Sequence, residues 1–166
     1  MLSFKNVTTD AEIQLVSKLA YELFPLDYGD YVRKEHIDYF LDEYQSESAI
    51  KNQINEGFEY FLFLHDGEVM GYVGIEIADY KIELSKIYVC QDKRGLGMGE
   101  QAMNWLEIYA KDTGARTFEL LVLEKNVKAI KFYKRLGFEV GEKFEHTFFT
   151  GYTEVNLRMV KELTEY

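Results

Sequence analysis

A glycine-rich stretch, QDKRGLGMGEQA at residues 91–102, joins a predicted strand (82–89) to a predicted helix that runs from about residue 100 to 113. Glycines leave backbone N–H groups open to an anion, and a helix N-terminus favours negative charge. Lys93 and Arg94 add two positive charges at the same point. The stretch therefore predicts a phosphate-binding loop between a strand and a helix, which is typical of an α/β sheet protein.

The periodicity of apolar residues changes at about residue 57. Before it, Thr9 to Glu12 forms a capping box that opens a helix, which we expect to end at Pro25. After it, alternating strands surround Asp66-Gly67, a strong hairpin turn signal. We expect one mixed α/β domain over residues 1–166. The remaining predicted elements are strands at 2–7, 58–65, 68–78, 81–89, 116–123, 138–144 and 153–160, and helices at 31–45, 48–57 and 126–137.

The strand at 81–89 does not alternate regularly. Ile82 and Leu84 share one face, but Ile87 and Val89 carry the apolar positions afterwards. A β-bulge near Ser85 would produce such a shift of one residue. We therefore expect a bulge there that separates this strand from its next neighbour.

Composition excludes several classes of protein. The chain has 166 residues, of which 47% are hydrophobic, and it has one proline and one cysteine, Cys90. No apolar run reaches the ~18 residues of a membrane-spanning helix, and no cluster has zinc-site spacing. The net charge of −10 disfavours a nucleic-acid binder. We expect a cytoplasmic protein with no metal, no nucleic-acid partner and no membrane association.

The charge is uneven along the chain. Residues 21–47 hold eight acids against two bases, whereas residues 125–135 hold five bases and no acid. Either run can be a solvated helix face. The alternative is that one run attracts a cationic ligand and the other an anionic one.

A dinucleotide-binding loop is the first alternative for the glycines. Residues 97–102 fit the pattern G-x-G-x-x-A, and Glu119 lies where a ribose-binding acid would be expected. That pattern belongs to repeated strand–helix–strand units, and this chain has too few crossover helices for them. A Walker A loop is excluded because no G-K-[ST] follows the glycines.

The better interpretation is a diphosphate without a nicotinamide. Residues 94–99, RGLGMG, resemble the [Q/R]-x-x-G-x-[G/A] signature of the GNAT superfamily of N-acetyltransferases. Residues 126–138, NVKAIKFYKRLGF, resemble the second diagnostic segment of that family, N-x-x-A-x-x-[F/L]-Y-x-x-x-G-F. The resemblance covers about residues 58–162. It implies a twisted, mostly antiparallel sheet of about six to seven strands, flanked by about four to five helices.

The resemblance also implies acetyl-coenzyme A as the co-substrate. The backbone of residues 87–89 would bind the pantetheine arm as an added strand, and amides of residues 94–99 would bind the diphosphate. Lys93, Arg94 and the basic run would offset its charge. The expected coenzyme-binding residues are Ile87, Tyr88, Val89, Arg94, Gly95, Leu96, Gly97, Met98, Gly99, Glu100, Asn126, Ala129 and Tyr133.

Catalytic candidates follow from the chemistry of acetyl transfer, because an amine must lose a proton and a thiolate must gain one. Tyr133 resembles the general acid of the family, although a core aromatic is the alternative. Glu83 resembles the glutamate that acts as base in several members, and Glu76 is the second candidate. A solvated strand glutamate is the alternative for Glu83. Cys90 has no histidine near it in the sequence, which disfavours an acyl-cysteine intermediate.

The acceptor is expected to be a small cationic amine. The acidic segment 21–47 falls in the helices that border the acceptor cleft in this family, and residues 120–138 are similar to polyamine acetyltransferases. We therefore expect an acceptor of the spermidine or spermine type. Acetylation of a protein N-terminus or lysine stays open, and so does a catalytically silent acyl-coenzyme A-binding regulatory module. Family members often form homodimers.

Overall fold

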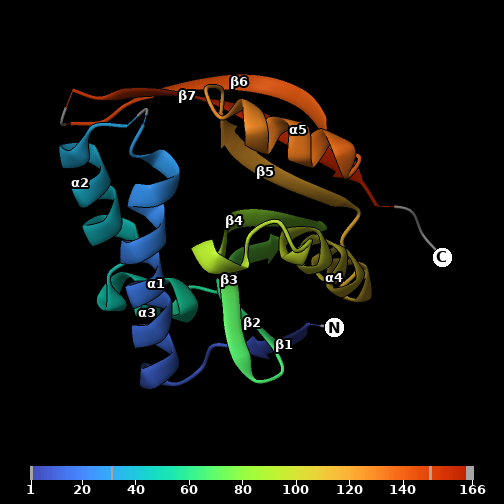
Figure 1. The fold of residues 1–166 in the computed structure, drawn as a ribbon. Coiled ribbons are helices and arrows are strands. Elements are labelled where there is room, and N and C mark those ends of the chain that lie inside the picture. Colours follow the sequence, from blue (N-terminus) through green and yellow to red (C-terminus); the bar gives the residue numbers. More distant parts are fainter. Residues whose placement is uncertain (1, 31, 150, 164–166) are drawn as a thin grey trace. The chain divides into compact units, whose positions relative to one another are not determined.

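The computed structural model describes residues 2–30, 32–149 and 151–163 (Figure 1). The chain forms two compact units. The N-terminal unit comprises Met1–Glu76 and Lys86–Met103, and the C-terminal unit comprises Ile77–Ser85 and Asn104–Tyr166. The elements follow the order β1 (Ser3–Asn6), α1 (Asp10–Tyr28), α2 (Lys34–Tyr44), α3 (Glu47–Asn55), β2 (Glu59–His65), β3 (Glu68–Ala78), β4 (Lys81–Val89), the 3-10 turn η1 (Gln91–Lys93), α4 (Met98–Asp112), β5 (Thr117–Leu123), α5 (Val127–Arg135), β6 (Glu139–Thr147) and β7 (Thr153–Glu162).

The described residues confirm the predicted fold class. Hydrogen-bonded neighbours in the sheet follow the order β1-β2-β3-β4-β5-β7-β6. The β4–β5 pair is parallel, while β1–β2, β2–β3, β5–β7 and β6–β7 are antiparallel. Within the described ranges, seven strands and five α-helices therefore make a mixed, mostly antiparallel α/β fold.

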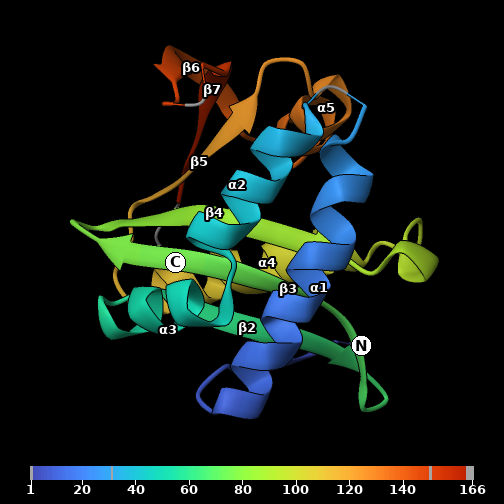
Figure 2. The ribbon, with the colours of Figure 1, turned by 90° about the vertical axis from the view of Figure 1, so that its left-hand side faces the viewer.

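Strands β1–β3 form the sheet of the N-terminal unit, and α1, α2 and α3 lie in front of β2 and β3 in Figure 2. The predicted hairpin is confirmed, because Asp66 and Gly67 both have positive φ, 50° and 81°. Strand β3 approaches β4 closely at Gly71, where a Cβ atom would lie 2.1 Å from the carbonyl oxygen of Tyr88. Only glycine fits there without moving the backbone of β4.

A buried polar cluster ties the helices to the strands in this unit. Gln45, just after α2, is 1% exposed. Its side-chain oxygen accepts a hydrogen bond from the Tyr72 hydroxyl at 2.7 Å, and its amide donates to the Tyr60 hydroxyl at 3.1 Å. Its backbone oxygen accepts from the Ser17 hydroxyl at 2.7 Å. Elements α1, α2, β2 and β3 therefore meet at one glutamine, which fixes their relative positions.

Helix α1 begins as predicted but ends later. Thr9 and Glu12 form the expected capping box, and Lys5 with the capping N–H groups lowers the pKa of Glu12 to about 2. The predicted end at Pro25 is wrong, because the helix continues to Tyr28 and Gly29 donates its N–H to the Pro25 carbonyl at 2.9 Å. Proline lacks a donor but keeps its acceptor, so the turn that follows it can still close.

Strand β4 contributes to both units, with its first half in the C-terminal unit and its second half in the N-terminal one. Ile82, Leu84 and Tyr88 are all buried, so the buried positions keep an even spacing along the sequence of the strand. The predicted shift of the buried face is therefore wrong, and Ile87 and Val89 are only half-buried. The alternation of aliphatic residues alone leaves out Tyr88, whose aromatic ring with a polar tip is also a core residue.

In the C-terminal unit, Lys81–Leu84 of β4 pair in parallel with Thr117–Leu120 of β5. Strand β7 then pairs with β5 on one side and β6 on the other. The core includes Phe118, Tyr133 and Phe138, whose rings pack edge to face. Strand β6 is exposed at all nine residues. No helix in the described ranges is long and apolar enough to cross a bilayer.

Candidate functional site

The predicted glycine loop lies at the end of β4 in the N-terminal unit. Gly95 and Gly97 have φ of 80° and 75°, and a Cβ atom at either would meet nothing within 4 Å. Glycine is therefore required there by the backbone conformation and not by crowding. The first bond of α4 runs from the Gln101 N–H to the Gly97 carbonyl at 3.1 Å. The N–H groups of residues 98–100 thus precede the ladder of α4, which is how a helix start presents donors to an anion.

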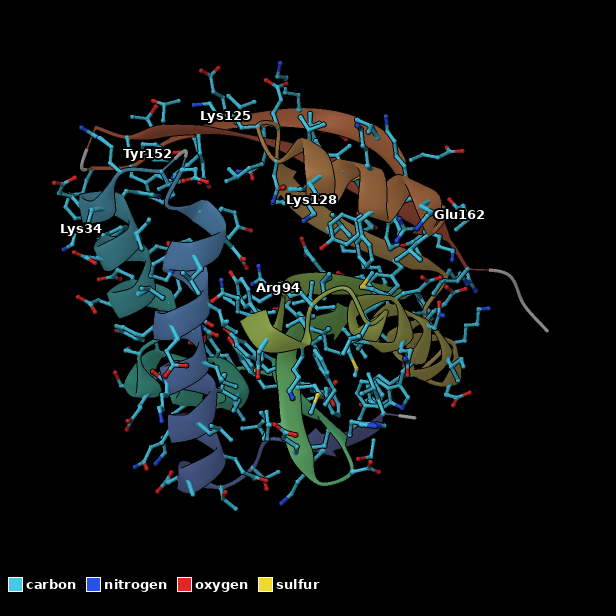
Figure 3. All side chains as sticks on the ribbon, in the orientation of Figure 1. Lys34, Arg94, Lys125, Lys128, Tyr152 and Glu162 are labelled. Atoms are coloured by element: carbon cyan, nitrogen blue, oxygen red, sulfur yellow. The ribbon has the colours of Figure 1, made fainter. Side chains whose placement is uncertain are left out.

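Both cations of the loop have acidic partners in the same unit. Lys93 Nζ lies 3.4 Å from Glu68 Oε1 and 3.8 Å from Asp92 Oδ2. Arg94 Nη2 lies 2.6 Å from Asp27 Oδ1 on α1, and Arg94 Nε donates to the Val89 carbonyl at 3.2 Å. Figure 3 labels Arg94 where the loop begins. The sequence did not indicate the Asp27–Arg94 pair, because these residues are far apart in the chain.

The predicted pantetheine segment, residues 87–89, continues into a paired backbone. The Cys90 N–H donates to the Met70 carbonyl at 2.8 Å, so pairing with β3 extends past Val89. Tyr88 points into the core, with its ring 5.4 Å from that of Tyr72 and 6.4 Å from that of Phe24. Its contribution to a ligand would therefore come from its backbone.

Lys86 is a residue that sequence reasoning missed. Its side chain is half-buried where β4 enters the N-terminal unit, and burial lowers its pKa to about 8. A substantial fraction of this lysine is therefore neutral at slightly alkaline pH. A lysine within a mostly apolar strand was the only sequence signal.

Tyr133 and Asn126 belong to α5 of the C-terminal unit. Tyr133 is 9% exposed and packs against the rings of Phe132 and Phe138. Burial raises its pKa well above the usual value, so the hydroxyl keeps its proton at neutral pH. Asn126 caps the helix, because its Oδ1 accepts the N–H of Ala129 at 3.1 Å. The oxygen of Asn126 thus has a structural role, and its amide nitrogen is the group left for a ligand.

Glu83 and Glu76 lie in different units. Glu83 Oε1 is 3.5 Å from Arg158 Nη1 on β7, and the same nitrogen donates to Glu119 Oε1 at 3.2 Å. The carboxylate of Glu83 thus already has an arginine partner. Sequence reasoning missed Arg158, which alternation alone places on the face opposite buried Met159. Glu76 is half-buried near the end of β3.

The two charged segments differ in exposure. In residues 21–47, seven of the eight acids are exposed and Asp27 is half-buried. All five bases of residues 125–135 are exposed, including the labelled Lys125 and Lys128 of Figure 3. Exposure of these side chains is compatible with a solvated face and with a surface that attracts charged ligands.

The described residues hold no group of three His, Cys, Asp or Glu side chains that could bind a metal ion. Cys90 is half-buried, and burial is the main cause that raises the pKa of its thiol. A thiol with a raised pKa is a weak nucleophile, which agrees with the argument against an acyl-cysteine.

The chain resembles known N-acetyltransferases. The model of the Acetyltransferase (GNAT) family matches residues 20–138. An uncharacterised N-acetyltransferase of Mycobacterium tuberculosis is 32% identical over 158 residues, which cover 93% of this chain and 99% of the relative. A spermidine N-acetyltransferase from Vibrio cholerae, in complex with CoA and spermine, has a TM-score of 0.75 at 17% identity, covering 98% of this chain and 95% of that one.

A third protein has the same level of likeness. The ribosomal-protein-S18-alanine N-acetyltransferase from Escherichia coli also has a TM-score of 0.75 at 17% identity, covering 100% of this chain and 96% of that one. These two neighbours share the fold but differ in the acceptor that their names give. The fold alone therefore does not select an acceptor. The family match over most of the chain, with a relative that aligns over nearly its whole length, leads to one conclusion: this chain belongs to the acetyltransferase (GNAT) family of acyltransferases.

Proposed function

We propose that this protein transfers an acetyl group directly from acetyl-coenzyme A to a primary amine. The observation that carries the proposal is the glycine loop, in which Gly95 and Gly97 adopt left-handed conformations just before the free N–H groups of α4. That arrangement suits a diphosphate. Tyr133 adds a buried phenol that stays protonated at the pH of the cell.

In the proposed reaction, the neutral amine attacks the thioester carbonyl carbon. A C–N bond forms, the C–S bond breaks, and the sulfur leaves as a thiolate. Tyr133 donates its proton to that thiolate, and the attacking amine loses a proton to a base. Glu83 and Glu76 are the proposed bases. Glu83 forms an ion pair with Arg158, and Glu76 is half-buried near the end of β3.

The proposed acceptor is a small polycation such as spermidine. The support is the acidic segment 21–47, whose exposed carboxylates attract positive charge through solvent. The alternative acceptors are a protein N-terminus or a lysine side chain. A silent acyl-coenzyme A-binding module is the alternative outside the enzymes.

Two measurements test the proposal. We expect acetyl-coenzyme A to raise the melting temperature of the protein and NAD not to do so. With acetyl-coenzyme A present, release of free thiol and the mass of the product are then followed for spermidine, spermine, a monoamine and peptides with a free N-terminus or lysine. Turnover of spermidine at the lowest KM supports the proposal, modification of the peptides alone replaces the acceptor, and coenzyme binding without turnover indicates the silent module.

Ionic strength sharpens the test of the acceptor. Attraction between exposed charges is screened by salt, with a Debye length of about 10 Å at 0.1 M. The KM for spermidine should therefore rise with added salt more than the KM for the monoamine. A spermidine KM that does not change from low to high salt would contradict the role of the acidic segment.

A further inference from the structure

Arg94 begins the coenzyme-loop signature, and its side chain reaches back toward α1 within the N-terminal unit. The guanidinium has two contacts, the Asp27 carboxylate at 2.6 Å and the Val89 carbonyl at 3.2 Å. It therefore connects three segments of that unit: the last turn of α1, the end of β4 and the start of the loop. The pair is partly enclosed, with 40% of the Arg94 side chain and 23% of the Asp27 side chain exposed.

Asp27 lies at a position where a negative charge destabilises its own helix. It is in the last turn of α1, which carries no basic residue, and the carbonyls of that turn already present partial negative charge. Arg94 supplies the positive charge that offsets both. Asp27 also differs from the seven other acids of residues 21–47, which are all exposed. Its carboxylate is thus engaged inside the unit and is not part of the exposed acidic surface.

The backbone at Arg94 needs such a side-chain anchor. Its N–H reaches the Gln91 carbonyl only at 3.4 Å, a long distance for a hydrogen bond, whereas the Lys93 N–H reaches the Cys90 carbonyl at 2.9 Å. The next residue, Gly95, turns the chain into the left-handed region. The two side-chain contacts of Arg94 therefore secure the point at which the loop leaves η1.

We propose that Asp27 is a positioning residue of the coenzyme loop, which it orders by holding Arg94 as a strut to α1. The proposal rests on the proposed binding of acetyl-coenzyme A at this loop. In this arrangement the loop amides bind the diphosphate, while the Arg94 guanidinium stays with Asp27 and Val89. In the opposite arrangement, the Arg94 guanidinium binds the diphosphate, and the Asp27 carboxylate competes with the diphosphate for it.

The two arrangements predict opposite effects of Asp27→Asn on the affinity for the coenzyme. If Arg94 is a strut, Asp27→Asn disorders the loop and weakens coenzyme binding, although it removes a negative charge near a polyanion. If Asp27 competes for Arg94, the same substitution frees the guanidinium and tightens binding. Asp30→Asn is the matched control, because Asp30 lies just beyond the same helix end and is exposed.

The experiment measures coenzyme A binding by calorimetry for the full chain, Asp27→Asn, Arg94→Gln, the double variant and Asp30→Asn. We expect each single Asp27 or Arg94 variant to raise Kd by roughly three- to tenfold, as the loss of an ordering ion pair would. The double variant should bind no more weakly than the weaker single one, because both remove the same contact. Tighter binding by Asp27→Asn, or additive losses in the double variant, would overturn the proposal.

Limited trypsin digestion gives a readout that needs no coenzyme. Trypsin cuts after Lys93 and Arg94, and Asp27→Asn leaves both sites intact. We expect cleavage there to be at least several-fold faster in Asp27→Asn than in Asp30→Asn, with coenzyme slowing it in both. Equal cleavage rates would contradict the strut. If the unaltered chain does not bind coenzyme A, the proposed function fails and the coenzyme role of Asp27 fails with it, whatever the digestion shows.

In steady-state assays, Asp27→Asn should raise the KM for acetyl-coenzyme A and leave kcat within about twofold, since Asp27 touches no reacting atom in this arrangement. Asp27→Glu, which keeps the charge, should recover part of the loss. A fall in kcat with an unchanged KM would contradict a positioning role.

Discussion

Each of the two units contains a deeply buried tyrosine, and the two hydroxyls are in opposite situations. In the N-terminal unit, Tyr72 is completely buried and donates to Gln45 Oε1 at 2.7 Å. In the C-terminal unit, Tyr133 is buried among the rings of Phe132 and Phe138, and its hydroxyl makes no hydrogen bond to any described residue. Burial raises the pKa of both phenols well above the usual range.

The comparison shows that a raised pKa does not by itself identify a catalytic group. Both tyrosines keep their protons at neutral pH, but the proton of Tyr72 is already committed to a hydrogen bond that holds the fold. The Tyr133 hydroxyl makes no such bond to a described residue and its oxygen is not fully enclosed, so its proton is available for transfer in the proposed reaction.

The largest expected effect is on turnover. Tyr133→Phe removes the proposed proton donor and should lower kcat by about 100-fold or more, the usual contribution of general acid catalysis. The Kd for acetyl-coenzyme A and the free energy of unfolding should change little, because the hydroxyl makes no hydrogen bond with the described residues. Wild-type turnover in this variant, with chemistry shown to be rate-limiting, would make Tyr133 a packing residue like Tyr72.

The next effect is on stability. Tyr72→Phe leaves Gln45 Oε1 without its donor in a fully buried place, which should cost about 1–3 kcal/mol in the free energy of unfolding by urea. Its kcat should stay within about twofold of wild type. Tyr80→Phe is the matched control, because the Tyr80 side chain is 68% exposed. A loss of turnover without a loss of stability in Tyr72→Phe would remove the distinction between the two tyrosines.

The smallest effect is expected in the pH profile. Because burial raises the pKa of Tyr133 well above its usual value, its hydroxyl should stay protonated and cause no fall in kcat between pH 7 and 9.5. The same raised pKa gives stability that is fully present below the unfolded pKa, about 10, and is lost as pH rises beyond that value. An alkaline decline in this window that disappears in a Tyr133→Phe enzyme with residual activity would show that its proton is lost far earlier than burial predicts.

Local patterns in the sequence predicted the features that depend on neighbouring residues. The capping box at Thr9, the turn at Asp66-Gly67 and the glycine loop each rest on backbone geometry within a few residues, and all three have the expected structure. The resemblance of residues 94–99 and 126–138 to the family segments identified the family, which the comparison confirms. The roles of individual site residues stay predictions.

Contacts between distant segments could not be read in the same way. The pairs Asp27–Arg94 and Glu83–Arg158 join residues 67 and 75 positions apart, and Gln45 meets strands of another part of the chain. No spacing rule relates such residues before the fold brings them together. The buried position of Tyr88 shows a second limit of sequence-based prediction. The alternation of apolar residues does not take into account the size and shape of an aromatic ring.

Strand β6, exposed over its whole length at the end of the sheet, bears on how the protein behaves at high concentration. An edge strand offers its backbone to other molecules, and charged side chains with a bulge are common protections against such pairing. Here the pairing with β7 shifts register between Val140 and Lys143, and three glutamates line the strand. The net negative charge of the chain falls toward zero as the pH approaches the isoelectric point of about 4.8. Aggregation should therefore set in on mild acidification, well before the buried cores of the two units come apart.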